Sequence, residues 1–360
     1  MTSTKLYLTL LQSIFYKNPK LGFSIFEKAP TFTLLREQKN NLLNMIPKSL
    51  KEPFIKQSET YNEEKIRANL GNIQIVSIQD PEYPKKLHQI YDPPLVLFYK
   101  GNISLASNQI LSIVGPRKTS DYSKKACTFF TSHLCHQFTI ASGLAEGIDT
   151  VSHEVTLSEG KSTIAVIAAG LNIAIYPSSN QKLAEEISQK GLIMSEFPPN
   201  CPALPYHFPQ RNRIISGISK GILICEAHEK SGSLITAQFG IEQNKDIFVI
   251  PGSIFSENTK GSHQLIQEGA ILVKDPEDIL KEYQLPLSIK KKDSLKKIDP
   301  ESITLSKDES EMLNHFSTMP LSSDELALKT GRPIHEILQY LTLLELKGVI
   351  QNNECGYTKI

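Results

Sequence analysis

The chain has 360 residues, 40% of them hydrophobic, a formal net charge of +1 and no tryptophan. This composition is typical of a soluble globular protein, and the length allows one large α/β domain with smaller appendages. No apolar run approaches the ~18 residues of a membrane helix, and the apolar N-terminus lacks a small-residue cleavage site, so we expect a cytoplasmic protein. The five cysteines show no C-x-x-C spacing, which argues against a zinc site or a disulfide framework.

Charge is spread unevenly along the chain. Residues 1–70 hold 11 Lys/Arg against 6 Asp/Glu, residues 71–285 hold 18 against 21, and residues 304–360 hold 5 against 8. No segment is basic enough to predict nucleic-acid binding from its net charge. A nucleic-acid site therefore has to be a local patch on a nearly neutral body.

The first 285 residues contain two kinds of pattern. Residues 1–70 alternate leucine-rich helical pieces with prolines, which predicts a helical N-terminal domain. Residues 71–285 alternate helical patterns with apolar runs, most of which close in a glycine or proline turn. Runs that are apolar throughout predict a parallel sheet buried on both faces, hence an extended Rossmann-like, doubly wound, mostly parallel core with ligands at the carboxyl ends of its strands. The runs are 73–78, 95–99, 110–114, 138–141, 163–170, 191–196, 221–227, 246–252 and 270–273.

The last part of the chain changes character twice. Residues 286–303 are charged and poor in apolar side chains, which predicts a linker. In residues 304–360 three helical patterns are followed by a segment, 348–360, that fits a β-hairpin wing. The third pattern, 333–348, has proline at its start and glycine at its end. This order predicts a winged-helix-like C-terminal domain.

The segment 208–217, FPQRNRIISG, carries the clearest chemistry. It places an aromatic ring three residues before Arg211, with Arg213 two residues later and two isoleucines directly after it. Arginine is a forked donor suited to phosphate oxygens, and a ring beside it can stack on a nucleobase. The combination is typical of single-stranded nucleic-acid binding. The alternative is that carboxylates hold both arginines in a domain core.

Two turns after predicted strands offer neighbours for these arginines. Gly115-Pro116-Arg117 precedes a helix, whose N-terminus can hold a phosphate together with backbone N–H groups. Residues 231–237 (SGSLITA) place small residues and hydroxyls at a helix start, where helix capping is the alternative. The G-x-G-x-x-G and P-loop fingerprints are absent from the sequence, so we expect no nucleotide cofactor.

Residues 142–149 (SGLAEGID) form a third turn. Two glycines allow close backbone approach, and Asp149 has His153 one helical turn later. An Asp–His pair suggests catalysis, but no G-x-S-x-G nucleophile accompanies it. The spacing therefore favours a structural pair.

In this order, these segments resemble the DNA-processing protein A family, also called DprA or Smf. The resemblance covers about 80–280 continuously, whereas residues 1–70 and 304–360 match by position and helical character. The segments that carry it are 92–102, 112–123, 142–154, 162–180, 191–199, 208–217, 231–237, 249–253 and 261–273.

The resemblance implies a non-enzymatic protein that binds single-stranded DNA, protects incoming strands in natural transformation and loads the RecA recombinase onto them. It also implies a homodimer through the Rossmann-like core, a SAM-like fold for residues 1–70, and no cofactor, metal or membrane partner. In this picture Arg117 grips a phosphate, Phe208 stacks on a base, and Arg211 and Arg213 line the same pocket. The DNA-binding residues it implies are Gly115, Arg117, Ser142, Gly143, Lys161, Phe208, Arg211, Asn212, Arg213, Ser231 and Gly232.

Three residues depart from the family pattern. Pro116 stands where serine or threonine is usual, Ser123 where glycine is usual, and His263 where asparagine is usual. Proline removes a hydroxyl and a backbone N–H from the phosphate turn, which predicts a weaker grip there.

Two other functions remain as alternatives. The first is a nucleoside-monophosphate phosphoribohydrolase-like enzyme on a related fold, but residues 226–237 read EAHEKSGSLITA where such enzymes have P-G-G-x-G-T-x-x-E. The second is a duplex DNA-binding regulator that acts through the C-terminal winged helix. The acidic balance of residues 304–360, with Glu336 and Glu345 on the third helix, argues against tight duplex binding.

Overall fold

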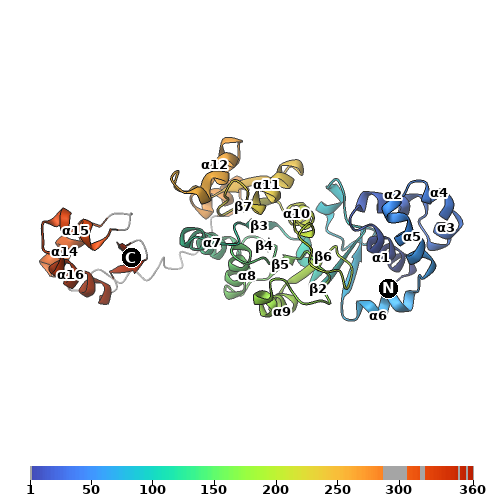
Figure 1. The fold of residues 1–360 in the computed structure, drawn as a ribbon, viewed down its shortest axis with the longest axis horizontal. Coiled ribbons are helices and arrows are strands. Elements are labelled where there is room, and N and C mark those ends of the chain that lie inside the picture. The colour runs from blue at the N-terminus through green and yellow to red at the C-terminus, as the bar shows by residue number, and fades with distance from the viewer. Residues whose placement is uncertain (1, 287–305, 317–320, 348, 354–355, 360) are drawn as a thin grey trace. The chain divides into compact units, whose positions relative to one another are not determined.

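The computed structural model of the chain describes residues 2–286, 306–316, 321–347, 349–353 and 356–359. The chain divides into two compact units, Met1–Leu287 and Ser288–Ile360 (Figure 1). The predicted linker, 286–303, lies outside the described residues except for its first residue. Within the described part, no helix combines the length and the apolar character that spanning a membrane requires.

Residues 2–70 form six helices, of which α1 (Ser3–Phe15) is buried along most of its length. Gln12 of α1 joins this helix to the sheet: its Nε2 donates to the carbonyl of Glu196 (2.9 Å), and its Oε1 accepts from the N–H of Leu95 (2.9 Å). One apolar core runs from α1 into the sheet. Because the helices and the sheet share this core, the predicted domain boundary at residue 70 stays a prediction. The other helices are α2 (Pro19–Lys28), α3 (Phe32–Glu37), α4 (Lys39–Leu43), α5 (Lys48–Glu59) and α6 (Glu63–Leu70).

Nine strands of the described chain form one sheet, in the order β1-β2-β6-β5-β4-β3-β7-β8-β9. The seven from β6 to β9 pair in parallel, and β1 and β2 join them in antiparallel pairing at one edge. The predicted mostly parallel sheet is confirmed. The strands are β1 (Gln74–Ser77), β2 (Val96–Gly101), β3 (Ile110–Val114), β4 (Thr139–Ser142), β5 (Thr163–Val166), β6 (Leu192–Ser195), β7 (Gly221–Ile224), β8 (Asp246–Val249) and β9 (Ile271–Leu272).

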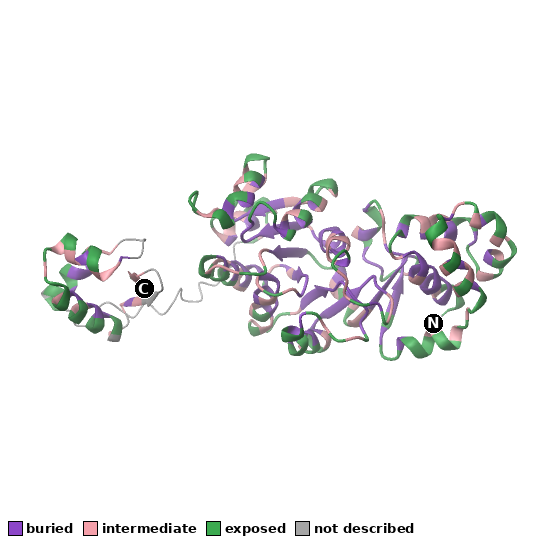
Figure 2. Cartoon of the chain, in the orientation of Figure 1, coloured by how far each residue is buried: buried purple, intermediate pink, exposed green. Residues whose placement is uncertain are grey.

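Helices cover both faces of the sheet. Figure 1 shows α7, α8 and α9 along one face and α10 and α11 along the other. The central strands β3, β5, β6 and β7 are therefore buried at every residue (Figure 2), which explains why they are largely apolar. The helices are α7 (Asp121–Leu134), α8 (Ile148–Ser158), α9 (Gln181–Lys190), α10 (His207–Ile218), α11 (Gly232–Glu242), α12 (Lys260–Gln267) and α13 (Pro276–Glu282), with short 3₁₀ turns η1 (Lys85–Gln89), η2 (Ile103–Ser107), η3 (Ser178–Asn180) and η4 (Glu257–Thr259).

The order of strands reverses at β3. From β3 the chain steps through β4 and β5 to β6 in one direction, then returns to place β7 on the other side of β3 and continues to β8 and β9. Ligands of doubly wound sheets bind outside the carboxyl ends of the strands where the order reverses. The fold thus directs attention to the ends of β3 and β7.

The second unit is small and helical, with a two-stranded ribbon. Its core contains Leu326, Ile337 and Leu341, and α15 and α14 begin at capping boxes formed by Ser322 and Ser306. The predicted winged-helix-like fold is confirmed. Its elements are α14 (Lys307–Asn314), α15 (Ser323–Thr330), α16 (Ile334–Leu346), β10 (Ile350–Asn353) and β11 (Gly356–Lys359).

Candidate nucleic-acid interface

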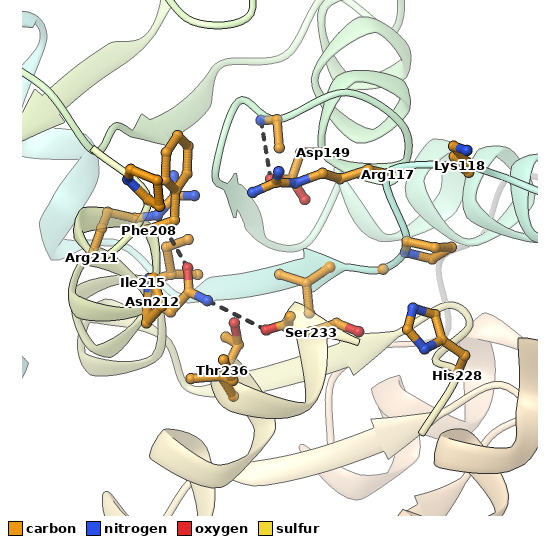
Figure 3. A pocket seen from close by; sticks show the side chains of 18 of the residues that line it. Arg117, Lys118, Asp149, Phe208, Arg211, Asn212, Ile215, His228, Ser233 and Thr236 are labelled. Atoms are coloured by element: carbon orange, nitrogen blue, oxygen red, sulfur yellow. Dashed lines mark hydrogen bonds between the residues drawn. The ribbon is translucent and has the colours of Figure 1, made fainter. Parts of the chain in front are cut away.

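A cavity of about 780 Å³ opens at the carboxyl ends of β3 and β7, at the switch point of the sheet. Figure 3 shows its walls: the turn after β3 with Arg117 and Lys118, helix α10, and the start of α11. We call this cavity the switch-point pocket. Its lining includes Gly115, Pro116, Arg117, Lys118, Asp149, Tyr176, Pro205, Phe208, Arg211, Asn212, Ile215, His228, Gly232, Ser233 and Asn258.

The turn after β3 is fixed by its contact with the start of α8. A Cβ on Gly115 would come within 2.6 Å of Ile148 Cγ1, so only glycine lets the turn lie so close. The carbonyl of Pro116 accepts a hydrogen bond from the N–H of Ile148 (3.2 Å). Arg117 and Lys118 follow this anchored turn and are exposed. The turn therefore holds two solvated cations at the mouth of the pocket.

Helix α10 supplies the opposite wall. Phe208, Arg211, Asn212 and Ile215 all line the pocket, and their spacing of i, i+3, i+4, i+7 places them on one face of the helix. The half-buried ring of Phe208 meets the exposed ring of Tyr176 edge to face, with 5.8 Å between centroids. The guanidinium carbon of Arg117 lies 5.1 Å from the centroid of the Phe208 ring, within the range of a cation–π contact.

Arg211 is a nearly buried cation with one carboxylate nearby. Only 5% of it is exposed, and its guanidinium donates to Asn212 Oδ1 (3.2 Å) and to the carbonyl of Val166. Burial lowers the pKa of Arg211 to about 10, and the charge of Asp149 opposes this. Arg211 therefore stays protonated at neutral pH.

The Asp149 carboxylate is hydrogen-bonded to the backbone of the preceding turn. It accepts hydrogen bonds from the N–H groups of Leu144 and Ala145 (both 3.3 Å). Burial raises the pKa of this carboxyl, and Arg211 counteracts that rise. A Cβ on Gly143 would collide with both Asp149 and Arg211, so glycine leaves room for both side chains beside it. The expected Asp149–His153 pair is wrong, because His153 Nδ1 instead contacts Thr163 Oγ1 (2.7 Å).

Arg213 does not face the pocket. Its Nη2 forms an ion pair with Glu196, its Nε lies 3.2 Å from Asp92 Oδ2, and only 2% of the residue is exposed. For this arginine the alternative of a buried salt bridge is the correct one. Burial raises the pKa of Glu196 to about 7, and Arg213 opposes that rise.

The remaining predicted residues divide between the pocket and its surroundings. Gly232 lines the pocket, whereas Ser231 is the N-cap of α11 and accepts from the N–H of Ser233 (3.3 Å). Ser142 is buried and donates to the carbonyl of Ile113 (2.6 Å). Lys161 is exposed and precedes β5, so it lies at the amino end of that strand, away from the pocket. Of the predicted residues the structure gathers Gly115, Arg117, Phe208, Arg211, Asn212 and Gly232 in the pocket lining, and not Ser142, Gly143, Lys161, Arg213 or Ser231.

Sequence reasoning missed several pocket residues, among them three with polar or aromatic side chains that are exposed. Lys118, Tyr176 and His228 all line the cavity and are exposed. Lys118 directly follows Arg117, and that adjacency was a usable signal. Tyr176 and His228 come from loops whose course the sequence does not show. No group of three or more His, Cys, Asp or Glu side chains in the described residues is arranged to hold a metal ion.

These features define a Rossmann-like ligand-binding core with an appended winged helix. The chain matches the model of the DNA recombination-mediator protein A family over residues 74–284, and the DprA winged helix domain over residues 297–353. It belongs to the DNA recombination-mediator protein A family.

Relatives with known names agree with this assignment. The DNA processing protein DprA of Streptococcus pneumoniae is 44% identical over 208 residues, which are 58% of this chain and 73% of the relative. The protein Smf of Escherichia coli is 37% identical over 294 residues, 80% of this chain and 78% of the relative. The family named from the sequence motifs is therefore confirmed.

Two solved structures extend the comparison. The X-ray structure of DNA processing protein A from Streptococcus pneumoniae matches with a TM-score of 0.67 at 34% identity, over 78% of this chain and 98% of that one. DNA processing protein A from Helicobacter pylori matches with a TM-score of 0.53 at 28% identity, over 59% and 96%. The latter structure describes a single-stranded DNA binding mode of the Helicobacter protein.

Proposed function

We propose that this protein binds single-stranded DNA in the switch-point pocket and catalyses no reaction there. The observation that carries the proposal is the arrangement of Arg117 over the Phe208 ring, with Tyr176 on the ring's edge and Arg211 below in the same cavity. The family assignment and the binding mode described for the Helicobacter pylori relative support it.

The chemistry of the lining suits an unpaired strand. Arg117 and Lys118 are solvated cations that can bind phosphate oxygens. The rings of Phe208 and Tyr176 offer stacking surfaces, which only unstacked bases can use. The first turn of α11, beginning at Gly232, adds the positive end of a helix to the same cavity.

The enzyme alternative lacks support in the pocket. The nucleotide-hydrolase pattern would place its acidic chemistry near residues 226–237, but Glu226 is buried and accepts hydrogen bonds from Ser120 Oγ (3.1 and 3.0 Å). Asp149, the carboxylate that does line the cavity, is held by backbone N–H groups and Arg211. Both carboxylates are explained by the fold, which favours binding over hydrolysis.

We extend the proposal to the biological role. The bound strand is protected during natural transformation in the cytoplasm and is passed to the RecA recombinase, and the protein acts as a homodimer through its Rossmann-like core. Membership in the DNA recombination-mediator family supports this extension. Size measurement in solution and a strand-exchange assay with RecA test it directly.

The binding proposal is tested by anisotropy titration of matched single- and double-stranded oligonucleotides at two salt concentrations. We expect a preference for single strands and an affinity that falls with salt. Arg117→Ala removes a charge-assisted phosphate contact of about 1.5–3 kcal/mol, so binding weakens about tenfold or more. Lys161→Ala is the matched control, because it removes an exposed cation at the opposite edge of the sheet.

Three results would contradict the proposal. They are equal affinity for duplex and single strands, equal losses in the Arg117 and Lys161 variants, and wild-type affinity in the Arg117 variant. Incubation of the protein with AMP, followed by assay for free adenine, tests the enzyme alternative, and we expect no release.

A further inference from the structure

A second pair of cation and ring adjoins the switch-point pocket. Pro205 lines the pocket, and the next residue, Tyr206, has 49% of its surface exposed. The Nζ of Lys17 lies 5.1 Å from the centroid of the Tyr206 ring. Arg117 and Phe208 form the corresponding pair inside the pocket, also at 5.1 Å. The start of α10 thus presents two cation-and-ring pairs, two residues apart in the sequence.

The ring of Tyr206 is held in place by the packing behind it. It meets the ring of His207 edge to face, with 4.6 Å between centroids, and His207 in turn packs on Phe197 at 4.2 Å. Tyr16, directly after α1, meets both of those rings at 5.7 Å. This aromatic cluster joins the end of α1 to the start of α10, so Lys17 and Tyr206 are presented by fixed elements.

Lys17 is free to bind an anion. It is exposed, and among the described residues no carboxylate lies within ion-pair distance of its ammonium group. Other lysines of the same helical region are engaged: Lys5 pairs with Asp80 (2.9 Å) and Lys39 with Glu59 (2.7 Å). Residues 1–70 also carry 11 Lys/Arg against 6 Asp/Glu. The helical region that carries Lys17 therefore has an excess of positive charge.

We infer that Tyr206 and Lys17 form a second stacking step for single-stranded DNA, which continues the path from the switch-point pocket onto the end of α1. The inference rests on the proposed function and adds the outer contact of the same strand. A base stacks on the exposed face of Tyr206, and the adjoining phosphate binds Lys17. The helical N-terminal region then contributes directly to DNA binding.

Oligothymidines of graded length, from about 4 to about 16 nucleotides, test this inference with the full chain. We expect the shortest strand that still binds to occupy only the switch-point pocket. Longer strands should also reach Tyr206 and Lys17, which we call the outer step. We expect Tyr206→Ala and Lys17→Ala each to weaken binding of the longer strands by at least about fivefold and to leave the shortest unchanged. Lys17→Ala should also lower the salt dependence by about 0.7 in the log–log slope.

Two further variants serve as controls. Tyr206→Phe keeps the ring and should retain the affinity of the wild type, which separates stacking from loss of fold. Lys220→Ala removes a similar pair, since Lys220 Nζ lies 4.0 Å from the centroid of the Tyr283 ring. Lys220 directly precedes β7 and thus lies at the amino ends of the strands, so its loss should change nothing.

The outcomes separate the outer step from the pocket. Wild-type binding of long strands by Tyr206→Ala, with Arg117→Ala still impaired, would overturn the outer step and leave the pocket proposal standing. Equal losses for short and long strands would also overturn it. Loss of RecA stimulation without loss of DNA affinity in the Tyr206 variant would assign the surface to a protein partner instead.

Discussion

The two faces of helix α10 hold arginines in opposite environments. On the pocket face, Arg211 shares one carboxylate, Asp149, and borders an open cavity. On the other face, Arg213 is enclosed and lies between Glu196 and Asp92. Two arginines only two residues apart in the sequence therefore differ in whether a ligand in the pocket can reach them. Arg211 borders the open cavity, whereas Arg213 is enclosed between two carboxylates.

The difference is one of electrostatic balance. A buried ion pair gains attraction but loses hydration on both charges, so it is seldom a source of net stability. The pKa of Glu196, raised to about 7, shows that the cost of burial exceeds the attraction of Arg213 there. Replacing the arginine of either face should therefore have a distinct result. Loss of Arg213 should lower the stability of the fold, and loss of Arg211 should weaken DNA binding.

The largest expected effect is that of Arg213→Ala. It leaves Glu196 and Asp92 without a buried partner, and such a change costs about 3–5 kcal/mol of unfolding free energy. Urea denaturation measures it. The double variant Arg213→Ala, Glu196→Gln removes one of the stranded charges and should recover part of the loss. A stable Arg213→Ala protein that has lost DNA binding would contradict the division between the two faces.

The second prediction concerns pH. The pKa of Glu196 in the folded protein, about 7, lies above the ordinary value of 4.5. Its contribution to stability is therefore fully present below pH 4.5 and is lost as the pH rises to about 7. We expect Glu196→Gln to lack this decline, on the order of 2–3 kcal/mol. Urea unfolding of both proteins at pH 5 and pH 8 compares the slopes, and identical slopes would disprove the assignment.

Phe208→Ala should act on the pocket face. Loss of a stacked base costs about 1–3 kcal/mol, or about 5- to 150-fold in Kd for an oligothymidine. Phe208→Tyr keeps the ring and should bind as the wild type does. Anisotropy titration provides the measurement, with thermal unfolding as a check on the fold. Unchanged affinity in the alanine variant would remove Phe208 from the site.

The smallest expected effect is that of Pro116→Ser in the turn after β3. Serine restores a hydroxyl and a backbone N–H at a residue that lines the pocket. One added neutral hydrogen bond contributes about 0.5–1.5 kcal/mol, so single-strand affinity should rise about 2- to 12-fold. Weaker binding by this variant would indicate that the rigidity of proline matters more than the missing donors.

The strands of the sheet followed directly from the sequence, because strands buried on both faces are largely apolar. Their order in the sheet, and with it the switch point, came only from the structure. Within 208–217 the sequence predicted Phe208, Arg211 and Asn212, which line the pocket, but assigned Arg213 to the same pocket. Treating the segment as a helix would have separated them, since Phe208, Arg211 and Asn212 share a face and Arg213 is turned about 100° away from Asn212.

Other residues needed the three-dimensional arrangement. Lys161 is an exception: it precedes β5, so the direction of the predicted strand was enough to place it at the opposite edge of the sheet. Tyr176 and Tyr206 reach the pocket region from loops, and no periodicity predicts where a loop side chain points. The carboxylates that neutralise Arg213 come from segments before β2 and after β6, far from it in the sequence.

Photocrosslinking tests directly whether single-stranded DNA binds in the switch-point pocket. An oligothymidine that carries a photoreactive thymine is bound to the full chain, irradiated, and the crosslinked residues are identified by mass spectrometry. We expect crosslinks at Phe208 and Tyr176, and we expect them to be lost when Arg117 is replaced by alanine. Crosslinks confined to the winged-helix unit, with none in the switch-point pocket, would contradict it.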